Sequence, residues 1–147
     1  MSVALAAGGR FPEVVLGISA AVWAAFGVWL FADPAALSHV GVVVETPSAR
    51  TEVRAFYGGL ELGVAAFLAW CLLTDEVRAG LAAALAAILT VGLCRTAAAA
   101  LERFEVSWLV LTLGAVELAS TGLTLAAMRS LATRKAPITD RRDGSSS

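Results

Sequence analysis

Apolar positions along the chain gather into four long runs that are separated by short polar stretches. The first run, residues 14–32, has no charged side chain and is long enough to cross a hydrocarbon core of about 30 Å. It also has no polar stripe, and a helix that is apolar all round lies in a membrane or in a core larger than 147 residues can build. We therefore predict an all-α fold, an up-down antiparallel bundle of four transmembrane helices. The expected spans cover about residues 13–32, 53–74, 78–101 and 106–128.

The connections between the runs predict how the spans begin and end. Asp33-Pro34 should close the first span, because a proline disfavours helix at the residue before it. Residues 35–50 form the longest connection, and we expect a short segment there that lies along the membrane interface with His39 at its surface. The connections 75–78 and 102–105 are short, which favours antiparallel hairpins.

Composition supports a membrane protein and narrows the classes of function. Hydrophobic residues make up 59% of the chain and charged residues only 16%, where an average soluble domain has about a quarter charged. A net charge of −1 excludes a protein that coats nucleic acid by bulk charge. Two cysteines and one histidine are too few for a zinc ribbon, a haem site or a disulfide scaffold, so we expect no metal, no cofactor and two free thiols.

Basic residues predict the orientation of the bundle. With four spans both termini lie on one side, and seven basic residues fall on that side against four at or near the other. The positive-inside rule then favours cytoplasmic termini. We expect one transmembrane domain, residues 1–130, and a disordered cytoplasmic tail, residues 131–147, because the tail is polar and ends in Asp-Gly-Ser-Ser-Ser.

Three of the four spans each contain one ionisable side chain near the middle of the membrane: Glu61, Arg95 and Glu117. At a rise of about 1.5 Å per residue, all three lie between the midplane and the outer surface. An unpaired ion in hydrocarbon is unfavourable, so we expect Arg95 to pair with Glu117 or with Glu61. The two carboxyl groups are the candidate acid and base of any chemistry here.

Helical spacing adds further candidates for binding to this group. Arg54, Tyr57 and Glu61 recur on one helical face, so Arg54 should reach toward Glu61 and Tyr57 should donate a hydrogen bond to a carboxylate. Trp108 is expected to cover the outer opening. Together these residues predict a polar pocket that opens outward between the second, third and fourth spans.

A pair of glycines in the second span predicts a close helix contact. Gly59 and Gly63 are spaced as Gly-x-x-x-Gly, a pattern that lets two membrane helices approach each other closely. We expect the partner to be the first span of the same chain, with a second subunit as the alternative.

Three functions remain open at this stage. The pocket binds, or also transforms, a small lipophilic molecule drawn from the bilayer, such as a quinone or an isoprenoid. Alternatively, the protein is an accessory subunit that has no substrate and whose intramembrane charges hold its own bundle together. Membrane lipids, a second copy of the chain or another membrane protein are the partners that the sequence leaves open. The third function is a proton or small-solute pathway. No phosphate-binding loop, dinucleotide fingerprint or nucleophile elbow is present, and the sequence does not decide whether the protein is an enzyme.

The segment 51–63 resembles the signature of a known family. Its pattern Glu52-x-Arg54-x-x-Tyr57-Gly58-Gly59-x-Glu61 is similar to that of small bacterial four-helix membrane proteins described as a domain of unknown function and grouped with the DoxX-like proteins. The resemblance covers most of the chain from the first span to the fourth. It implies a bacterial plasma membrane and adds Glu52 to the candidate binding residues. It supplies no activity, although the DoxX-like group suggests, by analogy, quinone or redox-linked partners.

Overall fold

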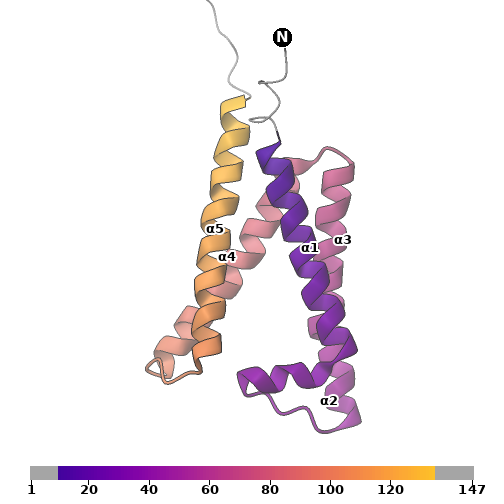
Figure 1. The fold of residues 1–147 in the computed structure, drawn as a ribbon, viewed down its shortest axis with the longest axis vertical. Helices are drawn as coiled ribbons and strands as arrows, with labels where there is room; N and C mark the ends of the chain where they lie inside the picture. The colour runs from indigo at the N-terminus through magenta and orange to yellow at the C-terminus, as the bar shows by residue number, and fades with distance from the viewer. Residues whose placement is uncertain (1–9, 135–147) are drawn as a thin grey trace, which may run out of the picture.

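The computed structural model describes residues 10–134, and this part of the chain is all-helical (Figure 1). Four helical stretches are long and apolar enough to cross a membrane, as the hydrophobic runs predict. The second stretch, Pro47–Leu73, is continuous but passes through one segment of π-helix. The elements are α1 (Phe11–Ala32), the 3₁₀ helix η1 (Pro34–Val40), α2 (Pro47–Glu52), the π-helix η2 (Val53–Gly59), α3 (Leu60–Leu73), α4 (Val77–Leu101) and α5 (Trp108–Arg134).

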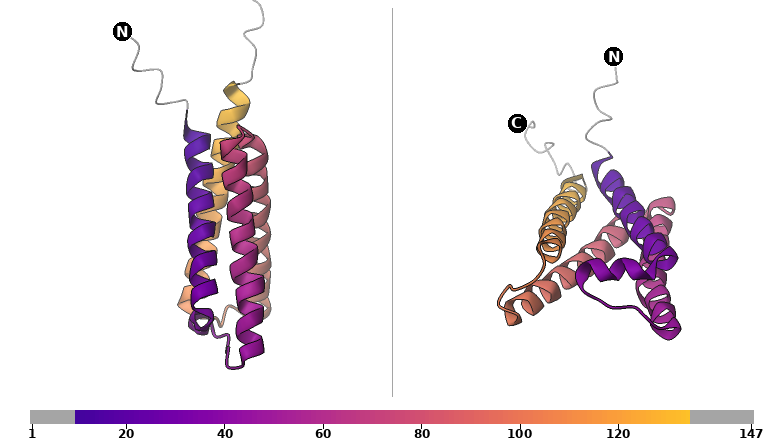
Figure 2. Two further views of the ribbon diagram at one scale, coloured as in Figure 1. Left: turned by 90° about the vertical axis from the view of Figure 1, so that its right-hand side faces the viewer. Right: turned by 60° about the horizontal axis from the view of Figure 1, so that its bottom comes forward.

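The long helices run alternately up and down, and they associate as two pairs. α1 packs along α3, and α4 packs along α5, with fewer contacts between the pairs. The two pairs meet at the end where α1 begins and α5 ends, and they diverge toward the opposite end (Figures 1 and 2). We call these the closed end and the open end. This arrangement confirms the predicted four-helix up-down bundle.

The main hydrophobic core lies where the helix pairs meet. Gly80 of α4 allows the closest approach, since a Cβ at this position would lie 2.8 Å from Leu16 Cδ2 and 2.9 Å from Cys71 Cβ. Side chains of α1 and α3 therefore pack directly against the backbone of α4 at this glycine. The buried members of this core are Val15, Leu16, Ala20, Leu68, Cys71, Val77, Leu81, Ala84 and Ala127.

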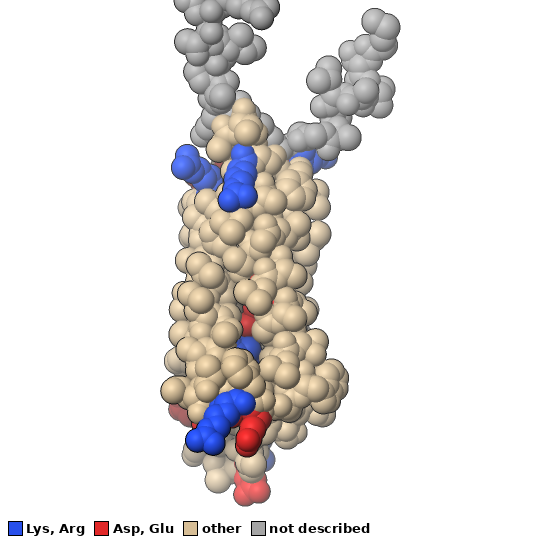
Figure 3. Space-filling view, turned by 90° about the vertical axis from the view of Figure 1, so that its left-hand side faces the viewer, with Lys and Arg blue, Asp and Glu red and all other residues tan. Residues whose placement is uncertain are grey.

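The outer surface of the bundle is mostly apolar. Large hydrophobic side chains such as Val14, Ile18, Leu93 and Leu118 are more than half exposed along the spans. On the face in Figure 3, charged atoms gather at the two ends, and only one small patch of acidic and basic atoms appears within the apolar belt. Such a surface needs a nonpolar environment, so the chain is a multi-pass membrane protein.

The first span ends at Asp33-Pro34, as the sequence predicts, and a short 3₁₀ helix follows it. α1 ends at Ala32, and Asp33 Oδ1 accepts a hydrogen bond from the Ala35 N–H at 3.1 Å, which caps η1. η1 extends sideways at the open end of the bundle (Figure 1), with Ala36 and Leu37 buried and His39 exposed. The placement of this segment along a membrane interface stays a prediction.

Two helix boundaries differ from the expected ones. The second span begins at Pro47 because Thr46 Oγ1 accepts from the Ala49 N–H at 3.1 Å and a proline suits the first helical turn. The last span continues to Arg134, because good helix formers follow Met128 and Leu131 still packs against the core. Residues 131–134 are therefore helical, and the rest of the predicted tail, 135–147, lies outside the described residues.

The close contact between α1 and α3 forms at other glycines than those expected. A Cβ on Gly27 would lie 2.8 Å from Leu62 Cγ, and one on Gly58 would lie 2.9 Å from Phe31 Cβ. Gly59 and Gly63 are exposed, and no atom of a neighbouring helix would come within 4 Å of a Cβ on either. The prediction that they contact the first span is wrong. Their contact with a second subunit stays a prediction.

Candidate functional site

Arg95 of α4 and Glu117 of α5 form an ion pair within the membrane-spanning region. Arg95 Nε donates to both carboxylate oxygens at 3.0 Å, and Arg95 Nη2 donates to Oε1 at 2.8 Å. The Arg95 side chain is 30% exposed and that of Glu117 is 17% exposed, so the pair is largely shielded. Of the two partners expected for Arg95, the structure therefore selects Glu117.

Glycines on both helices make room for this ion pair. A Cβ on Gly92 would lie 3.5 Å from Glu117 Cβ and 3.6 Å from Glu117 Oε2, and one on Gly114 would lie 3.8 Å from Arg95 Cδ. Each glycine is about one helical turn from a charged residue on its own helix, because three residues separate them. The small residues let α4 and α5 approach closely around the two long side chains.

The hydroxyl groups near Glu117 are used within their own helix. Thr121 Oγ1 donates to the Glu117 carbonyl oxygen at 2.8 Å, and Thr124 Oγ1 donates to the Ser120 carbonyl oxygen at 2.8 Å. Threonines in helices often bond in this way to the carbonyl one turn earlier. The polar part of the site therefore consists mainly of charged groups.

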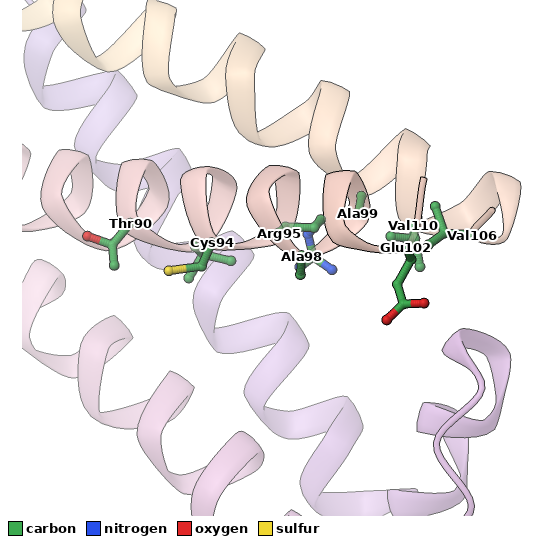
Figure 4. A pocket seen from close by; sticks show the side chains of 9 residues that line it. Thr90, Cys94, Arg95, Ala98, Ala99, Glu102, Val106 and Val110 are labelled. Carbon is green, nitrogen blue, oxygen red and sulfur yellow. The ribbon is translucent and has the colours of Figure 1, made fainter. Parts of the chain in front are cut away.

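Arg95 also lies on the wall of an open groove between α4 and the start of α5. The groove has a volume of about 510 Å³, within the usual range for a small-molecule site. Thr90, Cys94 and Ala98 lie in a row along α4 on this wall, and Val106 and Val110 lie at its end near the start of α5 (Figure 4). The groove is mostly apolar, and its charged groups are Arg95 and Glu102. The lining residues are Thr90, Val91, Cys94, Arg95, Ala98, Ala99, Glu102, Val106 and Val110.

One nitrogen of the Arg95 guanidinium is left over from the ion pair. Nε and Nη2 are occupied by Glu117, whereas Nη1 makes no hydrogen bond with any residue between 10 and 134. A guanidinium is a planar set of donors that accepts nothing, so its free edge favours an oxygen acceptor. Arg95, a residue of the mostly apolar groove wall, thus has an unused donor.

Glu61 lies apart from this ion pair. It is the second residue of α3 and is half-buried, and its Oε2 atom is shielded without a hydrogen-bond partner among the described residues. The expected convergence of Glu61 and Arg95 does not occur in this structure, since Arg95 is bound to Glu117 alone.

Arg54 and Tyr57 do not join Glu61 either. Arg54 Nε donates to the Phe31 carbonyl oxygen at 2.9 Å, and Tyr57 is 46% exposed with its ring against the ring of Phe56. The reason is the π-helix η2, which turns through a smaller angle per residue than an α-helix. The spacing that would place Arg54, Tyr57 and Glu61 on one face of an α-helix therefore fails here.

The two remaining candidates do not line the groove. Glu52 is exposed at the end of α2, and Trp108 is 75% exposed at the start of α5. The groove wall is instead completed by residues that the sequence reasoning missed as a group. The signal for them was present in α4, where Thr90, Cys94, Ala98 and Glu102 recur every fourth residue.

The two cysteines differ sharply in accessibility, and both are free. Cys71 is buried in the closed-end core, whereas Cys94 is exposed on the groove wall. We expect a membrane-permeant maleimide to label only Cys94 in the native protein and both thiols after denaturation, because a buried thiol cannot be reached. Peptide mass spectrometry measures the two sites separately. Labelling of Cys71 at the same rate would contradict the packing of the core.

Among known proteins, one sequence family matches the chain. The sequence model of one family, described as a domain of unknown function (DUF4345), matches residues 12–128. This match extends from the first span into the fourth and confirms a domain of unknown function, as the segment around Tyr57 suggests. No curated protein and no solved structure matches the chain.

Proposed function

The chain belongs to this family of unknown function, and we propose that its groove binds a small lipophilic molecule that enters from the bilayer. The observation that carries the proposal is the free Nη1 of Arg95 at a groove of about 510 Å³ with mostly apolar walls. Glu117 neutralises the guanidinium, so the bound group is a neutral oxygen acceptor and not an anion. A quinone carbonyl or an isoprenoid oxygen meets this description.

The open form of the groove supports entry from the side. Val91, Val106 and Val110 offer apolar contact for a hydrocarbon tail, while Arg95 offers the polar contact. A hydrogen bond to a charged donor contributes about 1.5–3 kcal/mol where water is excluded. One such bond with apolar walls is the usual composition of a ligand site.

A purely structural role is the second candidate, and the ion-pair geometry favours it. Three hydrogen bonds from Arg95 of α4 to Glu117 of α5 hold these helices in one register whether or not a ligand binds. A proton or solute pathway has less support. The closed-end core around Leu16, Leu68 and Leu81 is fully buried and apolar, so no polar route continues through it among residues 10–134.

We propose further that the protein lies in a bacterial plasma membrane with both termini in the cytoplasm. The basic residues Arg10, Arg78 and Arg129 flank the spans at the closed end, which agrees with the positive-inside rule. The relation to the DoxX-like proteins, and the quinone-linked partners that this would imply, stay predictions.

The binding proposal is tested through Cys94, which lines the groove. A fully substituted benzoquinone with a decyl tail should slow the alkylation of Cys94 by N-ethylmaleimide in purified protein. Arg95→Lys keeps a cation for Glu117 but removes the second donor branch, so we expect its apparent Kd for the quinone to rise about tenfold, the loss of one such bond.

Arg54→Lys is the matched control for this experiment, because Arg54 lies outside the groove and bonds to Phe31. It should protect Cys94 as well as the wild type does. If neither the quinone nor an isoprenoid alcohol protects Cys94 at saturating concentration, the proposal fails. If Arg95→Lys protects as well as the wild type does, the Arg95 contact is not used.

A further inference from the structure

The two acidic residues in the middle of the spans have different surroundings. Glu117 accepts three hydrogen bonds from Arg95, whereas Glu61 forms none with the described residues. Glu61 lies about 18 Å along the helix from the end of α3 at Leu73, at 1.5 Å per residue. Both carboxyl groups are therefore far from the closed end, but only one of them has a counter-ion.

Glu61 lies on the face of α3 that points into the bundle. The neighbouring positions on this face, Gly58, Ala65 and Leu68, are all buried. Gly58 packs directly against the backbone of α1, since a Cβ there would lie 3.0 Å from the Phe31 nitrogen. Glu61 Oε2 is itself shielded, although the side chain as a whole is only half-buried.

The charged groups on the elements around α3 either bind other partners or lie far from Glu61. Arg54 of η2 donates to the Phe31 carbonyl oxygen, and Arg95 of α4 is held by Glu117. Tyr57 of η2 forms no hydrogen bond with Glu61. On α1, Gly27 contacts Leu62, the residue after Glu61. Glu13 lies about four helical turns away from Gly27 along α1. Arg78 of α4 lies at the closed end.

A lone carboxylate in this position is unfavourable. Moving an isolated ion out of water without a partner has a large free-energy penalty, which a carboxyl group avoids by taking up a proton. We infer that Glu61 holds a proton at neutral pH and is the proton-exchanging carboxyl of this protein, whereas both carboxylate oxygens of Glu117 are bound by the Arg95 guanidinium. A neutral carboxylic acid both donates and accepts a hydrogen bond, so Glu61 provides a proton donor inside the bundle.

This inference does not depend on a ligand in the groove, and its test uses the protein without one. Dicyclohexylcarbodiimide partitions into membranes and reacts with protonated carboxyl groups. The carboxyl oxygen bonds to the carbodiimide carbon, and the carboxyl proton moves to a carbodiimide nitrogen. The acyl group then migrates from oxygen to nitrogen, which gives a stable N-acylurea with no leaving group. Peptide mass spectrometry identifies the modified residue.

We expect Glu61 to be modified at least about tenfold faster than Glu117, because the Arg95 guanidinium occupies the carboxylate oxygens of Glu117 and Glu61 has no such partner. Modification of Glu61 should slow as the pH is raised, because the reactive protonated form is lost. Glu117 is the internal control, since it is also a span carboxyl but has a guanidinium partner. Glu61→Gln should abolish the fast labelling and leave Cys71 protected from maleimide while Cys94 reacts, which shows that the variant is folded.

Equal labelling of Glu61 and Glu117, or labelling of Glu61 that does not change with pH, would overturn the inference. So would complete resistance of Glu61 in protein whose Cys94 reacts and whose Cys71 does not. These results leave the binding proposal untouched, because that proposal is judged by quinone protection of Cys94. Conversely, loss of quinone protection says nothing about the proton on Glu61.

Discussion

Replacing Gly27 with alanine is expected to destabilise the bundle by about 1–3 kcal/mol, the usual effect of forcing extra volume into a packed core. A Cβ at this position would lie 2.8 Å from Leu62 Cγ, 2.9 Å from the Leu62 nitrogen and 3.0 Å from the Gly58 carbonyl oxygen. Two of these three atoms belong to the backbone and cannot move aside as a side chain can. α1 and α3 must therefore separate, which loosens the contact that joins this helix pair.

The matched control for this substitution is Gly63→Ala in α3. No atom would lie within 4 Å of a Cβ on Gly63, and alanine favours helix over glycine, so this change should be neutral or slightly stabilising. Thermal unfolding in detergent, followed by circular dichroism, measures both variants. If Gly27→Ala unfolds at the wild-type temperature, or if Gly63→Ala is the more damaging change, the close approach of α1 to α3 is not as described.

The same glycines show what the sequence could and could not predict. Gly-x-x-x-Gly marks a surface on which helices approach, but it does not say which face of the helix the partner takes. The decisive positions are Gly27 and Gly58, one on each helix, and neither belongs to a spaced pair within its own segment. Their importance follows only from the crossing of α1 over η2, which is a tertiary feature.

The four spans, by contrast, follow directly from the hydrophobic runs. A membrane requires every backbone group to be bonded within the helix, so a long apolar run has few alternatives to an α-helix. The boundaries at Asp33-Pro34 and at the tight turn after Leu73 agree with the residue types there. The earlier start of the second span at Pro47 was also readable, since Thr46-Pro47 is a common beginning of a helix.

The candidate site was predictable in part. A lone arginine and a lone glutamate at similar depth in adjacent spans have a strong reason to pair, and Arg95 pairs with Glu117. The π-helix between Val53 and Gly59 has no clear sequence signal, and it separates Arg54 and Tyr57 from the face of Glu61. The groove could not be predicted from the sequence either, because it depends on the divergence of the two helix pairs at the open end.

Replacing Arg95 with leucine is expected to have the largest effect on stability of any charge substitution in the spans. The change leaves Glu117, whose side chain is 17% exposed, without the three hydrogen bonds it accepts in the native protein. Removing one partner of a buried ion pair has an effect of about 3–5 kcal/mol when the other charge remains. The loss here lies in the lower part of that range, because the ion pair is only partly buried. Thermal unfolding in detergent provides the measurement.

The double variant Arg95→Leu/Glu117→Leu separates the effect of the pair from the effect of an orphaned charge. Replacing both ions with apolar side chains of similar volume is often neutral or stabilising, so the double variant should recover most of the stability lost in Arg95→Leu. The two candidate functions then give different results for the quinone. If the groove binds quinone through Arg95, quinone no longer protects Cys94 in this stable double variant. If the ion pair only joins α4 to α5, the response of Cys94 to quinone is the same in the double variant as in the wild type. A double variant less stable than Arg95→Leu would show instead that the ion pair itself holds the two helices together.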